Sequence, residues 1–218
     1  MIGSGSGSRR AEPGRSGLMA TAIDCFARYG YAGTSIDRIA RAAGVTKGAL
    51  YYHFRDKEQL LFASVKERIE AFEQHVLGRV EQLADPAQAL REIARICALN
   101  AREDNHRRFI LTLMVEALDT NASLSAEFRE MLNRFRSFHR RLLRQGQERG
   151  AFRQDVDVPT AAVQFVSGIL GAEIQYYQDP ERIDLTKTLA CHVEQFLAWL
   201  TIPGGTAGAP VSGGRQRV

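Results

Sequence analysis

Apolar residues recur at helical spacing along almost the whole chain between residues 15 and 201. Leu18, Ala22 and Phe26, for example, lie four residues apart and would form one apolar stripe on a helix that Gly30 ends. Similar stripes follow, and no alternating run of convincing length for a β-strand separates them. The pattern therefore predicts an all-α fold of about nine helices.

Residues that cap helices indicate where the predicted helices begin and end. Thr34 and Asp37 form a capping-box pattern at the start of a second, short helix, which Gly44 ends. Thr46 is suited to cap a third helix, and Asp56 to cap a long fourth helix that reaches about residue 83. Further helices are expected near residues 86–101, 105–119, 124–148, 158–178 and 184–201.

The second and third helices, joined by a short turn that contains glycine, have the pattern of a helix-turn-helix. The second helix would bury one apolar face, formed by Ile36, Ile39, Ala40 and Ala43. In the third helix, Leu50 and Phe54 take the inward positions. The opposite face of the third helix is left with hydrogen-bond donors: Lys47, Tyr51, Tyr52 and His53.

Positive charge is concentrated in this same part of the chain. Between Arg9 and Arg68 there are 11 Lys and Arg residues against 6 Asp and Glu, a net charge of +5. From Ile69 to Val218 there are 18 against 19, a net charge of −1. An anionic partner such as DNA would be attracted to the first third, although a merely soluble basic surface has the same charge.

The run from Thr34 to Lys57 resembles the DNA-binding signature of TetR-type regulators. The matching positions are Ile39-Ala40, Ala43-Gly44-Val45, Gly48, Leu50-Tyr51, His53-Phe54 and Lys57-Glu58. The preceding Phe26-Ala27-Arg28-Tyr29-Gly30-Tyr31 resembles the family's first helix and its exit. The resemblance is close over about residues 15–65 and elsewhere covers only the number and length of the helices. It implies a DNA-binding domain at 15–60, with the motif at about 35–54, and a ligand-binding and dimerisation domain at 61–201.

The resemblance also implies which residues contact double-stranded operator DNA: Thr34, Ser35, Thr46, Lys47, Gly48, Tyr51, Tyr52, His53 and Lys57. Thr34 and Ser35 lie at the N-terminus of the second helix, where their hydroxyls and the backbone N–H groups would hold a phosphate. Lys47 would reach a base edge, and Gly48 would let the backbone approach the DNA closely. Thr46, Tyr52, His53 and Lys57 are assigned to phosphates, and Tyr51 to a phosphate or a thymine methyl group. The alternatives are that the tyrosines are core aromatics and that His53 bonds within the domain.

In the C-terminal part, the resemblance implies a pocket for a small-molecule inducer, which we expect to be largely apolar. Residues that could line this pocket are Phe109, Leu113, Met114, Phe128, Phe135, Phe165, Ile169 and Tyr176. Apolar stripes near 159–178 and 184–201 predict half of a four-helix homodimer bundle, the alternative being an intramolecular core. A basic stretch is interpreted as a solvated helix face or as a site for an anionic head group: Arg134, Arg136, His139, Arg140, Arg141 and Arg144.

The sequence lacks the motifs of enzymes, metal-binding proteins and membrane proteins. Three widely spaced cysteines in apolar stretches favour buried free thiols, and the histidines have no metal-ligand spacing. No nucleophile elbow, nucleotide loop or paired metal motif occurs, so we expect no catalytic residue, cofactor or metal. The chain has no apolar run of the ~18 residues that a membrane span needs and no signal-peptide pattern, which favours a cytoplasmic protein.

The two ends of the chain differ in composition from the helical part between them. Residues 1–14 and 202–218 are dominated by Gly, Ser and Ala and are predicted to be disordered tails. The whole pattern favours a transcriptional regulator, most simply a repressor that a small molecule releases from its operator. The alternative is a helical adaptor or ligand-binding protein that binds no specific operator.

Overall fold

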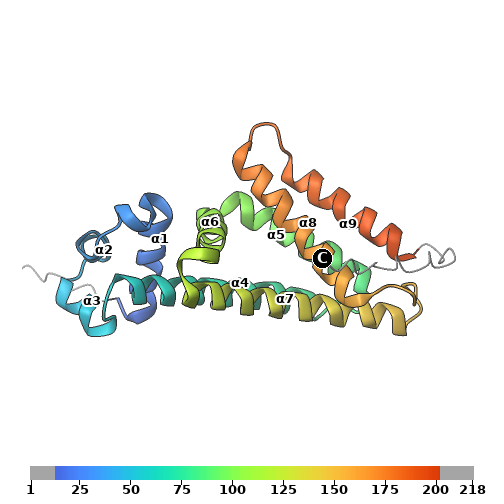
Figure 1. Ribbon diagram of the computed structural model, residues 1–218, viewed down its shortest axis with the longest axis horizontal. Helices are drawn as coiled ribbons and strands as arrows, with labels where there is room; N and C mark the ends of the chain where they lie inside the picture. Colours follow the sequence, from blue (N-terminus) through green and yellow to red (C-terminus); the bar gives the residue numbers. More distant parts are fainter. Residues whose placement is uncertain (1–12, 202–218) are drawn as a thin grey trace, which may run out of the picture. The chain divides into compact units, whose positions relative to one another are not determined.

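The computed structural model describes residues 13–201, and every regular element in this range is a helix (Figure 1). The described helices are α1 (Arg15–Gly33), α2 (Ile36–Ala43), α3 (Lys47–His53), α4 (Lys57–Val80), α5 (Pro86–Glu103), α6 (Asn105–Thr120), α7 (Ala122–Glu148), α8 (Val158–Gln178) and α9 (Leu185–Thr201). The all-α prediction is confirmed, and the predicted tails, except for Pro13 and Gly14, lie outside the described residues. None of the described helices is long and apolar enough to cross a membrane.

Most of the predicted helix ends are observed because they depend on local caps. Gly30 has φ 70° and ψ 171°, which interrupts α1 before a last short turn to Gly33. Gly44 takes the left-handed conformation, with φ 70°, that ends α2 and begins the turn. The Thr46 side chain accepts a hydrogen bond from the backbone N–H of Ala49 at 3.2 Å, and Asp56 accepts one from Gln59 at 2.8 Å.

The predicted capping box at the start of α2 is wrong by one residue. Ser35, not Thr34, is the N-cap, and its hydroxyl oxygen accepts a hydrogen bond from the backbone N–H of Arg38 at 3.2 Å. Thr34 is buried instead, because its hydroxyl donates to the carbonyl oxygens of Cys25, at 3.1 Å, and Gly30, at 2.7 Å. The residue that looked like a cap therefore joins α2 to α1.

The chain forms two compact units, and each of them combines segments that are separated in the sequence. Within the described residues, one unit consists of residues 13–78 and Leu99–Met131, and the other of Arg79–Ala98 and residues 132–201. The first unit therefore contains α6 as well as the helix-turn-helix. The predicted boundary between a DNA-binding and a ligand-binding domain lies inside this first unit.

The first unit has one apolar core that begins in α1. The side chains of Leu18 and Phe26 are almost completely buried, as are Ile39 of α2 and Leu50 of α3. Phe26 also stacks on Phe109 of α6, with 6.3 Å between ring centroids and an angle of 6° between the rings. Packing thus joins α1 both to the helix-turn-helix and to α6.

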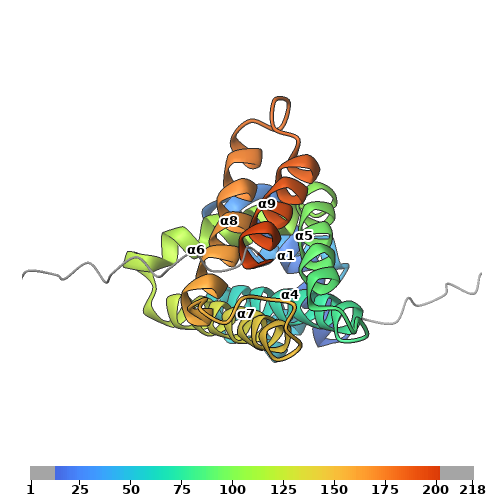
Figure 2. The same cartoon turned by 90° about the vertical axis from the view of Figure 1, so that its right-hand side faces the viewer.

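The second unit is built around Phe165 of α8, which is fully buried. Its ring lies 4.9 Å from the His139 ring, 5.5 Å from His192 and 5.1 Å from Phe196. Helices α8 and α9 run side by side (Figure 2). At Gly168 they approach so closely that an added Cβ would lie 2.2 Å from the His192 ring. The small residue is therefore required by this crossing.

The three cysteines form no disulfide with one another, and they do not share one environment. Cys25 and Cys97 are buried as expected, and burial raises the pKa of the Cys25 thiol. Cys191 on α9 is exposed, so the expectation of a buried thiol is wrong there.

Candidate DNA-binding interface

The turn between α2 and α3 is held by backbone hydrogen bonds, which fix how α3 is presented. The N–H of Gly44 donates to the carbonyl of Arg41 at 3.2 Å, and the N–H of Val45 donates to that of Ala40 at 3.0 Å. Leu50 and Phe54 are buried below α3, as predicted. One face of α3 is thereby committed to the core, and the other is available for a partner.

The outward face of α3 carries most of the predicted DNA-contacting residues. Tyr51 is 53% exposed and Tyr52 is 85% exposed, which rules out the alternative that they are core aromatics. Thr46, Lys47 and Gly48 are also exposed. His53 is half-buried and packs edge-on against the Tyr52 ring at 5.0 Å. Because Tyr51 and Tyr52 are so exposed, each has a ring face and a hydroxyl available for another molecule.

Lys47 has an acidic neighbour on α2 in the free protein. Its Nζ lies 2.7 Å from Oδ2 of Asp37, and both side chains are 54% exposed. Because exposed ion pairs contribute only about 0–1 kcal/mol, Asp37 orients Lys47 without holding it strongly. A phosphate or a guanine edge can therefore replace this carboxylate at little cost.

Nothing in the described protein requires the glycine at position 48. A Cβ there would have Oγ1 of Thr46, at 3.7 Å, as its nearest neighbour, which is an ordinary contact. Glycine inside a helix costs about 0.5–1 kcal/mol relative to alanine. The backbone of α3 at Gly48 is thus open to the close approach of another molecule.

Two of the predicted contact residues are used inside the protein. The prediction that the Thr34 hydroxyl holds a phosphate is wrong, because that hydroxyl points inward to Cys25 and Gly30. Lys57 donates from Nζ to the carbonyls of Tyr31, at 2.9 Å, and Thr34, at 3.1 Å. An ammonium group has three donors, so the predicted phosphate contact of Lys57 has one donor left.

The sequence interpretation missed a group of cations at the junction of α1 and α2. The guanidinium groups of Arg38 and Arg28 lie 4.1 Å and 5.4 Å from the centre of the Tyr29 ring, which is 42% exposed. Arg38 also donates its backbone N–H to the hydroxyl of Ser35, the exposed N-cap of α2. They are ten residues apart in the sequence, so only the folded contact between α1 and α2 shows that they share one aromatic ring.

The chain matches known regulators along most of its length. Residues 18–64 match the family model of bacterial regulatory proteins of the tetR family, and residues 109–189 match a tetracyclin repressor-like C-terminal domain. The chain is 30% identical over 201 residues to the HTH-type transcriptional repressor NicS of Pseudomonas putida, which covers 89% of this chain and 90% of that protein. The chain belongs to the TetR family. It is a DNA-binding transcriptional regulator.

Other TetR-family proteins agree with this assignment in sequence and fold. A probable acrEF/envCD operon repressor of Escherichia coli is 26% identical over 188 residues, which covers 84% of each chain. A TetR transcriptional regulator from Chloroflexus aurantiacus has a TM-score of 0.75 at 25% identity, covering 87% of this chain and 94% of that one. The transcriptional regulator FadR from Bacillus subtilis, in complex with stearoyl-CoA, has the same fold, with a TM-score of 0.72 at 21% identity over 84% of this chain and 97% of that one.

The residues that we expected to line the TetR-type ligand pocket divide between the two units. Phe109, Leu113, Met114 and Phe128 belong to the first unit, and Phe135, Phe165, Ile169 and Tyr176 to the second. Leu113, Phe128, Phe165 and Ile169 are buried, and the other four are half-buried. Two cavities described in the first unit, of about 890 Å³ and about 20 Å³, include none of the eight. The pocket thus stays a prediction.

The basic stretch on α7 is not uniform, because His139 does not belong to a charged surface. Its side chain is buried, and Nδ1 lies 2.7 Å from the carbonyl oxygen of Phe135. Burial lowers the pKa of His139 to about 4, so the ring is neutral at pH 7. Arg136 and Arg140 donate to Asn133 and Ser137 on their own helix, as residues of a solvated face do.

Proposed function

We propose that this regulator is a homodimeric repressor that binds an approximately palindromic operator and leaves it when a largely apolar small molecule binds. The observation that carries the proposal is the outward face of α3, where exposed tyrosines and Lys47 surround a glycine that the protein itself does not need. This is the arrangement of a recognition helix that enters the major groove. Because its partner would be operator DNA, the proposal also places the protein in the cytoplasm. The proposed function involves no catalytic step.

Apolar residues on α8 and α9 support the homodimer. Val163 and Ile174 on α8 are 44% and 43% exposed, and Trp199 on α9 is 37% exposed. Val163 and Ile174 are eleven residues apart, close to three helical turns, so they lie on one face of α8. Two such α8–α9 pairs would cover these side chains in a four-helix bundle. A twofold dimer would present two copies of α3 to half-sites about 34 Å apart or a multiple of that distance.

The second unit also supports a role in ligand binding. Its interior is rich in aromatic rings, and Phe135 and Tyr176 are half-buried residues of the same unit. The FadR relative was crystallised with stearoyl-CoA, which shows that this fold accommodates a long apolar chain in that protein. An inducer must prefer the DNA-free state, and a preference of ~100-fold corresponds to about 2.7 kcal/mol of coupling.

A competition experiment separates this function from that of a helical adaptor. A labelled duplex from the region upstream of the protein's own gene is bound in the presence of excess unlabelled duplex of the same or of scrambled sequence. A repressor is displaced by the upstream sequence at much lower concentration, since specific binding is typically about 10³-fold or more tighter than non-specific binding. Equal competition by both sequences, or no binding at low salt, would contradict the proposal.

A further inference from the structure

Three consecutive residues of α1 contact α6 on one side and the helix-turn-helix on the other. Oδ1 of Asp24 lies 2.6 Å from Nε2 of His106, the second residue of α6. The Cys25 carbonyl accepts the hydrogen bond from the buried Thr34, which directly precedes the N-cap of α2. Phe26 stacks on Phe109 of α6. One turn of α1 therefore connects the start of α6 to the start of α2.

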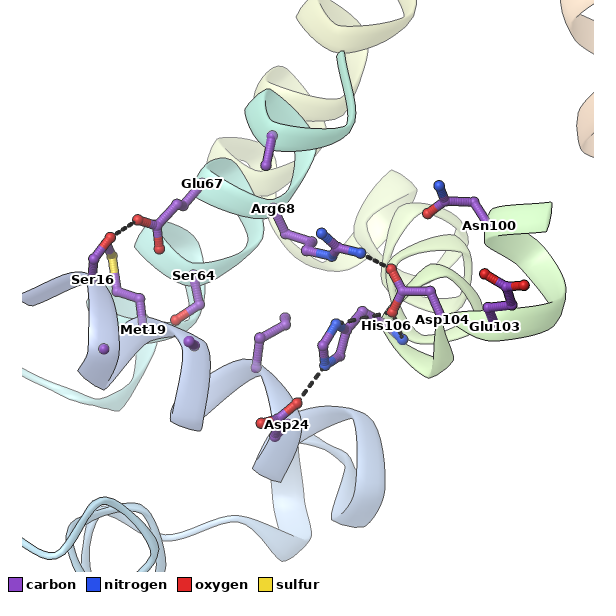
Figure 3. Close-up of a pocket in the computed structure, with 14 residues that line it drawn as sticks. Ser16, Met19, Asp24, Ser64, Glu67, Arg68, Asn100, Glu103, Asp104 and His106 are labelled. Carbon is purple, nitrogen blue, oxygen red and sulfur yellow. Dashed lines mark hydrogen bonds and ion pairs between the residues drawn. The ribbon is translucent and has the colours of Figure 1, made fainter. Parts of the chain in front are cut away.

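His106 is itself held in place by charged neighbours (Figure 3). Asp104 caps α6 by accepting a hydrogen bond from the backbone N–H of His106 at 2.9 Å. Nδ1 of His106 lies 3.0 Å from the same carboxylate oxygen, which is ion-pair distance without the alignment of a hydrogen bond. Arg68 of α4 pairs with the other oxygen of Asp104. The imidazole ring thus lies between two carboxylates, one on α1 and one at its own helix N-terminus.

This bridge borders a cavity of about 890 Å³ in the first unit. The cavity is lined by residues of α1, α4, α6 and the end of α5, and Asp24, Arg68, Asp104 and His106 are all part of its wall. Figure 3 shows the dashed contact from His106 reaching Asp24 on α1. The Asp24–His106 contact borders open space. On the side of the cavity, therefore, no packed side chains would take over the role of this contact if it were lost. The Phe26–Phe109 stack would remain as the neighbouring link between α1 and α6.

We propose that His106 is a positioning residue for operator binding. Through Asp24 it holds the turn of α1 from which Thr34 positions α2, so the helix-turn-helix is ordered before DNA arrives. Order that exists before binding does not have to be established during binding, and affinity rises accordingly. This inference rests on the DNA-binding function but adds a residue of α6 that the DNA-binding signature does not contain.

Truncation of either partner tests the proposal. We expect Asp24→Ala and His106→Ala to bind the upstream operator duplex roughly three- to tenfold more weakly than the wild type, and the double variant to bind no more weakly than the weaker single variant. The slope of log affinity against log salt should stay unchanged, because no phosphate contact is lost. Asp24→Asn keeps an acceptor for His106 and should recover part of the affinity.

Because Asp24 is negatively charged, the direction in which operator affinity changes in Asp24→Ala is informative. Removal of a carboxylate near a DNA-binding surface should strengthen binding if only long-range electrostatics acted, whereas the proposal predicts weaker binding. Glu70→Gln is the matched control, since it removes an exposed carboxylate of α4 in the same unit. This control should bind the operator as tightly as the wild type or slightly more tightly.

Each outcome separates the positioning role from the function on which it rests. If the wild type and Glu70→Gln bind the operator specifically and the folded Asp24→Ala and His106→Ala variants bind equally well, His106 has no positioning role. Additive losses in the double variant, or a changed salt slope, would also overturn it. Should His106→Ala fail to unfold cooperatively, Asp24→Ala decides alone, because the Asp24 side chain is 69% exposed. If the wild type itself shows no preference for the operator, the proposed function fails instead.

Discussion

The hydroxyl of Thr34 donates a hydrogen bond to the carbonyl oxygen of Cys25 across 3.1 Å of buried space, nine residues back in the chain. This contact, together with the one to Gly30, ties the start of α2 to α1. Lys57 adds a second tie by donating to the carbonyl of Thr34 itself. The position of the helix-turn-helix relative to α1 therefore depends on polar contacts as well as on the apolar core.

Replacement of Thr34 by valine should destabilise the protein without a direct effect on DNA contacts. Valine has nearly the same shape but no hydroxyl, so the buried carbonyl of Cys25 and the part-buried carbonyl of Gly30 lose a donor, at a cost of about 1–3 kcal/mol. The free energy of unfolding in urea measures this loss. Thr34→Ser keeps the hydroxyl and should lose less. A Thr34→Val variant of unchanged stability whose operator affinity has a reduced salt slope would instead place a phosphate contact at Thr34.

Alanine at position 48 should separate stability from DNA binding. The added methyl group has room, and relief of the glycine penalty should raise the free energy of unfolding by about 0.5–1 kcal/mol. Operator affinity should fall because the methyl group stands where the DNA approaches. Gly78→Ala is the matched control, because a Cβ added at this position of α4 meets nothing within 4 Å. It should stabilise the protein and leave the operator affinity unchanged, and the same behaviour of Gly48→Ala would contradict this interpretation.

The α8–α9 crossing should not tolerate a side chain at position 168. A Cβ there would lie 2.2 Å from the His192 ring, so Gly168→Ala forces the ring or the helices to move, with an expected loss of about 1–3 kcal/mol. Gly171→Ala on the same helix meets nothing within 4 Å and serves as the control. Thermal unfolding of both variants measures the difference. His192→Ala should partly rescue Gly168→Ala, and the absence of any rescue would show that the ring is not the obstacle.

Stability should depend on pH through His139. Burial lowers its pKa to about 4 in the folded protein, against an ordinary value of 6.5 in the unfolded chain. Between these values the unfolded chain takes up a proton that the folded protein does not, so stability is full above about pH 6.5 and falls as the pH is lowered toward 4. The free energy of unfolding should decrease by about 2 kcal/mol from pH 7 to pH 5 on account of this residue. Urea titrations of the wild type and His139→Gln measure it, and an equal decrease in both proteins would exclude His139 as the cause.

The helices could be predicted from the sequence because their signals are local. Apolar spacing and a capping side chain lie within a few residues of the helix end that they determine, as Thr46 does for α3. The choice between Thr34 and Ser35 as the cap could not be made in this way. It depends on the carbonyls of Cys25 and Gly30, which α1 places against Thr34 only in the folded protein.

The parts of the site that the sequence did not reveal are contacts between distant residues. Asp24 and His106 are 82 residues apart, and neither belongs to a recognisable motif. His139 looked like one more cation among the arginines of α7, because residue type indicates charge but not burial. Its neutral state follows from its position against Phe165, on a different helix.

The central claim is that the outward face of α3 binds operator DNA, and a salt titration of Lys47→Ala tests it most directly. Fluorescence anisotropy with the upstream duplex gives the affinity at several salt concentrations, with Lys187→Ala on α9, also an exposed lysine, as the control. We expect Lys47→Ala to bind more weakly and, because the positive charge of Lys47 next to the DNA also neutralises a phosphate, to lose about one unit of the salt slope, while Lys187→Ala matches the wild type. Equal affinities and equal slopes for Lys47→Ala and the wild type would contradict the claim.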